Sequence, residues 1–248
     1  MRHQEAFIGF ALAFVLMLTG TAPAGAATPV YVVGTLYKRH ADAPAYDLKA
    51  LDRIVREIAP SVLVLDVTPT ELEKKEVFPG KIEYPGVIFP LLAENKLVAY
   101  ASEPAEPMFT EIVQATIKAF DDFGKSKPDL SAALTAYNEA TYAVLMRSWQ
   151  TPADAHGKPT EIALDAKSAL SDAFVGAVSA DGRRRWNEHI AGVAATAVRE
   201  HPGQRVLVVT GIENRGPVCA LLKAQAGVEL VDMEHWLRQH ETATAPKS

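Results

Sequence analysis

Two acidic residues stand where carboxylates could do chemistry. Asp66 lies inside the apolar run from Ser61 to Val67, and Glu213 follows Gly211 at the end of another apolar run. A carboxylate inside such a run is costly unless it is paired, hydrogen-bonded or bound to a ligand. Asp66 and Glu213 together could hold a divalent metal ion, or act as acid and base with help from His40. A site rich in oxygen ligands favours a hard ion such as Mg²⁺ or Ca²⁺.

Further polar residues follow these two apolar runs or the earlier run Pro29–Val33. They are Tyr37, His40, Glu71, Asn214 and Arg215. Parallel strands bring their carboxyl ends to one edge of a sheet, so we expect these residues to converge with Asp66 on one rim. His40, Glu213 and Arg215 could equally be ordinary solvated charges, and Asp66 could be paired with an arginine for structural reasons.

The elements that would position these residues alternate between strands and helices. Pro29–Val33, Ser61–Val67 and Arg205–Thr210 are β-branched apolar runs typical of strands buried on both faces. A helix capped by Asp47 separates the first two runs, and Pro217 is expected to start a helix after the third. This alternation predicts an α/β fold with a mostly parallel central sheet flanked by helices.

The middle of the chain has a different pattern. Leu97–Ala101 is expected to be a third strand, and residues from about 104 to 180 have helical periodicity. This block is too long for one crossover helix, so we interpret it as a helical insertion over the sheet. The early and late strands must then complete one sheet, which predicts a single domain over residues 28–241 and a disordered tail over residues 242–248.

Residues 1–27 resemble a secretory signal. Arg2 precedes an apolar run from Phe7 to Leu18, which is shorter than the roughly 20 residues that span a bilayer, and small residues follow. An uncleaved anchor is the alternative. Cleavage would place the mature protein in the bacterial periplasm or outside the cell, with no integral membrane segment.

The composition excludes several classes of protein. The chain has 248 residues, 48% of them hydrophobic, which is enough to fill a core. Its net charge of −5 and its lack of a long basic run argue against nucleic acid as a partner. A single cysteine, Cys219, excludes a disulfide framework.

Five short segments occur in an order that matches a known family. They are Gly34–Tyr37, the strand ending at Asp66, Glu83-Tyr84-Pro85, Arg185-Trp186-Asn187 and Gly211–Arg215. Together, over residues 30–100 and 183–232, they resemble the TraB/Tiki family, whose relatives include haem-uptake and erythromycin-esterase-like proteins. That family has two Gly-x-x-His motifs after strands and an acidic residue ending the second strand, and metalloprotease activity in Tiki proteins is tied to a metal held by such residues.

The resemblance implies roles for particular residues. Catalytic roles fall on Asp66, Glu213, Arg185 and Asn187, binding roles on Tyr37, Asn214, Arg215 and Glu83, and metal ligation on Asp66 and Glu213. His40 lies outside the matched segments and is a binding candidate because it follows the first expected strand. Tyr37 and Asn214 stand where the family has its motif histidines, and Asp66 replaces a glutamate. Phenol and carboxamide are poorer metal ligands than imidazole, so this chain would be a divergent member of the family.

Three functions follow as hypotheses. The first is an exported protein with a binding or regulatory role, whose partner is an unknown small molecule or peptide. The second is a metal-dependent, peptidase-like hydrolase built around Asp66 and Glu213, and the third is a structural protein of the cell envelope. Carboxylates of Asp66 and Glu213 within about 4–6 Å in a pocket would favour the hydrolase. Pairing of Asp66 with Arg185 or Arg215, without a cavity, would favour an inactive protein.

Overall fold

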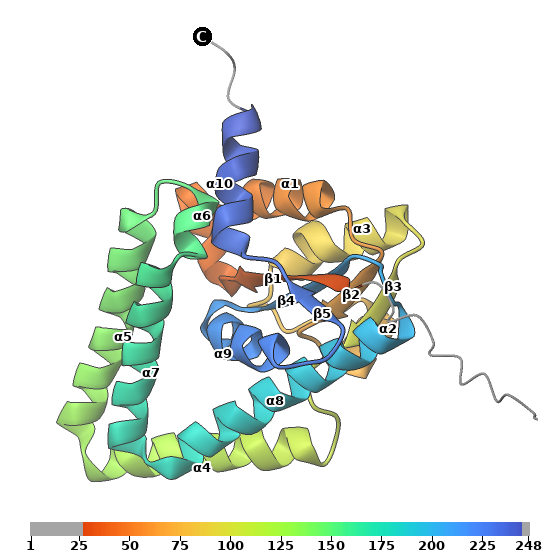
Figure 1. Cartoon of the computed structure of the whole chain (residues 1–248). Coiled ribbons are helices and arrows are strands. Elements are labelled where there is room, and N and C mark those ends of the chain that lie inside the picture. Colours follow the sequence, from red (N-terminus) through yellow and green to blue (C-terminus); the bar gives the residue numbers. More distant parts are fainter. Residues whose placement is uncertain (1–26, 245–248) are drawn as a thin grey trace, which may run out of the picture.

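A parallel β-sheet forms the centre of the molecule (Figure 1). The computed structural model describes residues 27–244, so the expected signal peptide, apart from Ala27, lies outside the described residues. Within this range the sheet contains β1 (Thr28–Thr35), β2 (Val62–Leu65), β3 (Val98–Ala101), β4 (Val206–Gly211) and β5 (Val228–Leu230). The strands are all parallel and lie in the order β3-β2-β4-β1-β5, which confirms the predicted α/β fold.

The late strand β4 lies between the two earliest strands. Its Val206 is in register with Val30 of β1 on one side and with Val62 of β2 on the other. The first two strands in the sequence are therefore parallel but not neighbours. All residues of β2 and β4 are buried, as expected for the interior strands of a sheet covered on both faces.

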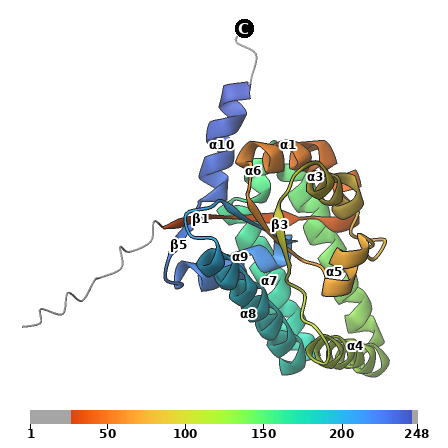
Figure 2. The same cartoon turned by 90° about the vertical axis from the view of Figure 1, so that its right-hand side faces the viewer.

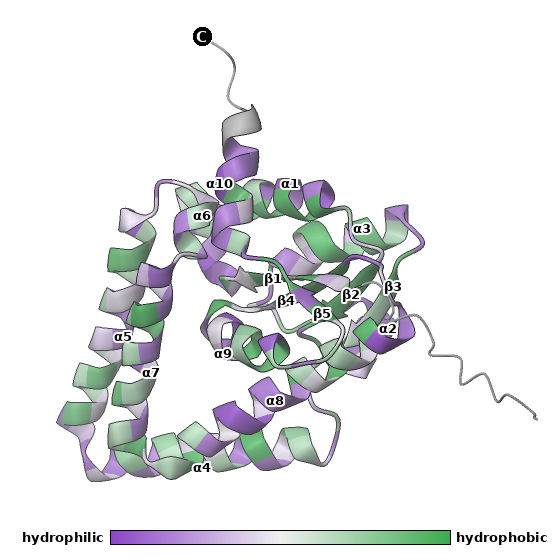
Figure 3. Cartoon of the chain, viewed as in Figure 1, coloured by the Kyte–Doolittle hydropathy of each residue, from purple (hydrophilic) through white to green (hydrophobic). Residues whose placement is uncertain are grey.

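Helices cover both faces of the sheet, as Figure 2 shows edge-on. One face is covered by α1 (Leu48–Ile58), α3 (Phe89–Glu94) and α10 (Met233–Thr244), and the other by α8 (Ala177–Glu200) and α9 (Ile212–Lys223). Because strand side chains alternate between faces, Leu63 and Leu207 join the first cluster, whereas Val64 and Val208 join the second. In Figure 3 the apolar colouring marks strands of the sheet and parts of the helices that cover it, and it also extends along α4, α5 and α7.

A helical frame separates β3 from β4. It contains α4 (Met108–Ser126), α5 (Pro128–Ser148), α6 (Pro152–Ala155), α7 (Lys158–Val175) and the beginning of α8. Helices α5 and α7 lie side by side and form an arm that leads away from the sheet (Figure 1). At the far end of this arm, α4 packs along α8. The middle of the chain is thus helical as expected. However, α8 begins at Ala177 and continues without a break to Glu200, so it runs past the expected end of the insertion near residue 180.

Short helices form several connections. They are η1 (Tyr37–Ala41), η2 (Pro44–Tyr46), α2 (Pro69–Lys74) and the π-helical turn η3 (Tyr84–Ile88). Helix α10 extends to Thr244, beyond the start of the expected disordered tail, and residues 245–248 lie outside the described range. No helix in the described part of the chain has the length and apolarity needed to cross a membrane.

Helix α9 begins earlier than the sequence suggested. Pro217 was expected to be its first residue, but the helix starts at Ile212, directly after β4, and contains Pro217 in its interior. Glu213, Asn214 and Arg215 therefore lie on the first turn of a helix and not in a loop. Successive helical side chains point about 100° apart, so these three cannot share one direction.

Candidate functional site

A cleft lies at the carboxyl edge of the sheet. Its floor contains one polar side chain from the end of each of four strands: Tyr37 after β1, Asp66 after β2, Glu103 after β3 and Asn214 after β4. The cleft has a volume of about 350 Å³ and is open to solvent. Its walls come from α4 and α8 and include Ile112, Val113, Ile117 and Trp186. Ligands of parallel sheets bind at this edge, so we take the cleft as the candidate site.

Tyr37 and Asp66 are joined at the floor of the cleft. The Tyr37 hydroxyl donates to Oδ2 of Asp66 at 2.7 Å, and Asp66 is only 2% exposed. Burial, followed by the effect of Asp66, raises the pKa of Tyr37 well above its usual value, so the phenol remains a donor. Among the described residues, Oδ1 of Asp66 has no hydrogen-bond partner. One acceptor of this buried carboxylate is therefore left unsatisfied.

The backbone at Tyr37 is held in an unusual conformation. Its φ of 53° lies in the left-handed region, which is rare for an aromatic residue. The ring packs directly over Gly211 at the end of β4, where an added Cβ would lie 3.0 Å from Cζ of Tyr37. The phenol can reach Asp66 only because position 211 has no side chain.

Glu103 and Lys81 form a buried ion pair beside Asp66. The Lys81 ammonium contacts Oε1 of Glu103 and donates to the backbone oxygen of Asp66 at 2.6 Å. Burial raises the pKa of Glu103 to about 7, although Lys81 opposes this shift. For Lys81, burial lowers the pKa, but Asp66 and Glu103 outweigh burial and raise it. Close to neutral pH, Glu103 can therefore hold or release a proton.

Glu83 is fully buried just before the π-helical turn. In the described part of the chain, neither of its carboxylate oxygens has a hydrogen-bond partner. The nearby Thr35 hydroxyl donates instead to the backbone oxygen of Thr210 at 3.3 Å. Burial raises the pKa of Glu83 to about 7. We refer to Asp66, Glu83 and Glu103 as the acidic cluster.

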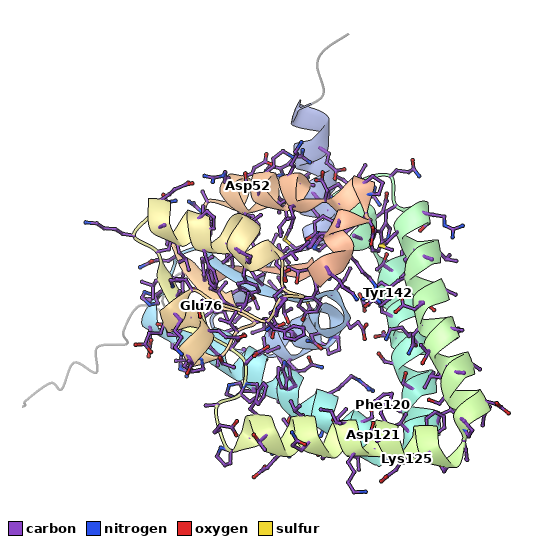
Figure 4. The ribbon with its side chains drawn as sticks, turned by 180° about the vertical axis from the view of Figure 1, so that it is seen from behind. Asp52, Glu76, Phe120, Asp121, Lys125 and Tyr142 are labelled. Atoms are coloured by element: carbon purple, nitrogen blue, oxygen red, sulfur yellow. The ribbon has the colours of Figure 1, made fainter. Side chains whose placement is uncertain are left out.

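Glu213 does not face this cluster. Its carboxylate binds Lys167 of α7 at 2.9 Å and accepts a hydrogen bond from the Tyr142 hydroxyl of α5. Seen from behind in Figure 4, Tyr142 lies where the arm meets the sheet layers. Glu213 lines a separate pocket next to α7, so the structure does not form the expected pair of Asp66 and Glu213. Its role in the structure is to hold the helical arm against α9.

Arg215 and His40 are also used structurally. Arg215 donates to the backbone oxygen of His156 and, like Glu213, does not line the cleft. His40 is buried, accepts from the Leu36 amide at 3.0 Å and bonds the Tyr46 carbonyl at 2.7 Å. Burial lowers its pKa to about 4, so it remains neutral with both ring nitrogens occupied.

The two residues of α8 that the resemblance singled out have different surroundings. Arg185 pairs with Glu111 of α4 at 3.0 Å on the surface. Asn187 is buried, and its Oδ1 has no hydrogen-bond partner among the described residues, but it does not line the cleft. Within the same range Asp66 forms no ion pair with Arg185 or Arg215.

The residues present do not form the expected metal site. No group of three or more His, Cys, Asp or Glu side chains in residues 27–244 is arranged to hold a metal ion. Tyr37 and Asn214 contribute a phenol and a carboxamide to the cleft, and Glu213 is bound to Lys167 and Tyr142. The two expected metal ligands, Asp66 and Glu213, are therefore not brought together in the cleft.

Sequence reasoning missed three features of the site. Glu103 follows the third strand just as Asp66 follows the second, so the same argument could have found it. Lys81 has no comparable signal, because it reaches the site through tertiary packing. Trp186 lies in one of the segments of the resemblance, but nothing in the sequence indicated that its ring lines the cleft.

Comparisons of the chain with protein-family models, with curated proteins and with solved structures find no match.

Proposed function

We propose that this protein binds a small molecule or a short peptide segment in the cleft at the carboxyl edge of its sheet. The observation that carries the proposal is the convergence of Tyr37, Asp66, Glu103 and Asn214 from four strand ends on one open cleft. Apolar walls and a few polar groups on the floor are typical of small-molecule sites. The rare backbone conformation of Tyr37 supports a functional role, since strain of this kind is concentrated at binding and catalytic sites.

We also propose that the chain is a divergent, exported TraB/Tiki-like protein. Support comes from the positions of the motif residues: Tyr37, Asp66 and Asn214 line one cleft, and Glu83 is buried next to the same strand ends. Export rests on the sequence of residues 1–27 alone. Because Tyr37 and Asn214 replace the motif histidines, we assign the cleft a binding role and not metal-dependent hydrolysis.

A direct test is a fragment screen by NMR on the purified protein. We expect fragments with apolar bodies to bind in the cleft and to lose binding in Ile117→Trp, which places a larger ring on the cleft wall. Ile162→Trp is the matched control, because Ile162 is 57% exposed on α7 and does not line the cleft. Binding that both variants leave unchanged, or a screen without hits in the cleft, contradicts the proposal and favours a structural envelope protein.

A second candidate is a hydrolase that uses two carboxyl groups without a metal. It is favoured by one observation: Asp66 and Glu103 line the same cleft, and Glu103 has a pKa of about 7, suited to proton transfer at neutral pH. Asp66 would accept a proton from the water molecule that attacks the substrate, and Glu103 would donate a proton to the leaving group as its bond to the substrate breaks.

Fluorogenic esters, peptides and glycosides test this second candidate. It requires turnover that survives a chelator and falls about a hundredfold or more in Glu103→Gln. Glu76→Gln is the control, since Glu76 is exposed on the surface away from the arm (Figure 4). Absence of turnover, or turnover that Glu103→Gln leaves unchanged, rules the candidate out.

A further inference from the structure

The floor of the cleft carries more negative charge than its neighbours neutralise. Asp66 and Glu103 line the cleft, and Glu83 lies close enough to Asp66 for the two charges to interact. In the described part of the chain, the cation that contacts these groups is Lys81. Arg183 at the cleft is already held by Asp172 and by the Ser179 hydroxyl.

The same floor has an unsatisfied acceptor. Oδ1 of Asp66, which lines the cleft, is buried without a hydrogen-bond partner among residues 27–244. Both carboxylate oxygens of Glu83, which does not line the cleft, are also buried without partners in that range. A buried polar atom left unsatisfied costs about 1–3 kcal/mol. A ligand that brings donors to this place would remove part of that cost, whereas a ligand that brings acceptors would add to it.

The position of Lys81 shows that an ammonium group fits against this floor. Its Nζ contacts the Glu103 carboxylate and the backbone oxygen of Asp66 at once. An ammonium has three donors and no acceptor, which complements a surface composed of carboxylates. A second ammonium, brought by a ligand from the open side of the cleft, would meet the Asp66 carboxylate, which Lys81 contacts only through the backbone oxygen.

The walls of the cleft suit an apolar body attached to such a cation. Ile112, Val113 and Ile117 contribute aliphatic surface from α4, and Trp186 contributes an aromatic ring from α8. Indole faces attract organic cations through their quadrupole, more strongly than other aromatic rings do. Gly182 allows α4 to approach α8 closely here, since an added Cβ would lie 3.1 Å from the Thr116 hydroxyl.

From these contacts we infer that the cleft recognises organic cations, specifically a protonated amine carried on an apolar or aromatic body. The ammonium group faces Asp66 and Glu103, and the body packs between α4 and Trp186. The inference rests on the proposed binding function and names the class of its ligand. Anionic ligands are disfavoured, because their charge would face the acidic cluster.

Three probes of nearly one shape test the inference: 2-phenylethylamine as the cation, 2-phenylethanol as the neutral analogue and 3-phenylpropanoate as the anion. Affinities are measured by NMR titration of the purified protein near pH 7.5. We expect the amine to bind about tenfold or more tightly than the alcohol, and the carboxylate to bind most weakly. The advantage of the amine over the alcohol should disappear in Asp66→Asn, which keeps the size of the side chain and removes its charge.

Asp121→Asn is the matched control, because it removes the same charge from the outer part of α4 (Figure 4). Equal binding of the three probes, or tighter binding of the carboxylate, overturns the inference but leaves the proposed binding function intact. If none of the probes binds but the fragment screen finds ligands in the cleft, the inference is likewise overturned and the proposed binding function stands. Failure of both experiments overturns the function and the inference together. The comparison of probes needs only the unaltered protein, so it holds even if Asp66→Asn does not fold.

Discussion

At the scale of single residues, Gly211 decides whether Tyr37 can reach Asp66. We expect Gly211→Ala to displace the Tyr37 ring and to break its hydrogen bond to Asp66, because the new Cβ would lie 3.0 Å from Cζ. The loss of stability should be about 1–3 kcal/mol, as for other overpacked sites, and urea denaturation measures it. Gly192→Ala is the control: a Cβ there meets no described group within 4 Å, and alanine should stabilise α8 by about 0.5–1 kcal/mol. Equal effects of the two variants would contradict this account.

The buried Glu83 carboxyl should make stability depend on pH. Its pKa is about 7 in the folded protein against an ordinary value of 4.5, so the folded state keeps the proton longer than the unfolded state does. The contribution of Glu83 to stability therefore falls as the pH rises from about 4.5 to 7. Glu83→Gln should abolish this part of the pH dependence. The difference in unfolding free energy between the variant and the native protein should therefore shift in favour of the variant by on the order of 3 kcal/mol between pH 4.5 and pH 8. Urea denaturation at both pH values tests this, with exposed Glu57→Gln as the control.

At the scale of elements, the strands and the start of α9 show which parts of the site could be predicted from the sequence. The strands could be recognised because each buried run has a strong local pattern, and Asp66 was found because it lies within one of them. The sequence could not predict that Glu213, Asn214 and Arg215 point in different directions, because this depends on α9 starting at Ile212 and not at Pro217. The role of Glu213 as a support for the arm depends on Lys167 and Tyr142, which lie far away in the sequence.

The contact of Glu213 with the arm leads to a further prediction. Lys167→Met should loosen α5 and α7 from α9, since Glu213 would lose its ion pair with a lysine that is only 8% exposed. Hydrogen exchange of α5 and α7 should become faster, and stability should fall by about 1–3 kcal/mol. Binding of fragments in the cleft should persist, because Lys167 does not line it. Loss of that binding with unchanged exchange would instead support the role in the active site that the sequence suggested for Glu213.

At the scale of the whole molecule, two buried histidines enclose Tyr46. The rings of His40 and His156 lie edge-on to it at 5.0 and 5.2 Å, and His156 accepts from the Gly34 amide at 3.2 Å. Burial lowers the pKa of His40 to about 4 and that of His156, which Arg215 lowers further, to about 3. Both remain neutral in the fold while the unfolded chain binds protons below about pH 6.5, so stability falls as the pH falls through that range.

The histidines and the buried glutamates act in opposite directions. Between about pH 6.5 and 4.5, acidification weakens the fold through His40 and His156 and strengthens it through Glu83 and Glu103. Below about pH 4.5 the glutamate contribution is complete, and the histidines still titrate. We expect thermal unfolding curves to show nearly constant stability from pH 6.5 to 4.5 and a steep loss below. A steady decline from pH 6.5 downward would contradict this balance.

The central position of β4 has a consequence for the order of events during synthesis. β1 and β2 leave the ribosome early, yet each has β4 as a neighbour and neither pairs with the other. In the nascent chain, the edges of β1 and β2 that pair with β4 thus stay unpaired until residue 211 has been made. Pairing of strands so far apart in the sequence slows folding. A chain that stops at Gln204 should remain protease-sensitive, whereas one that stops at Thr244 should become resistant. Ribosome-bound chains of increasing length, tested by pulse proteolysis, would show whether protection appears only once β4 has emerged.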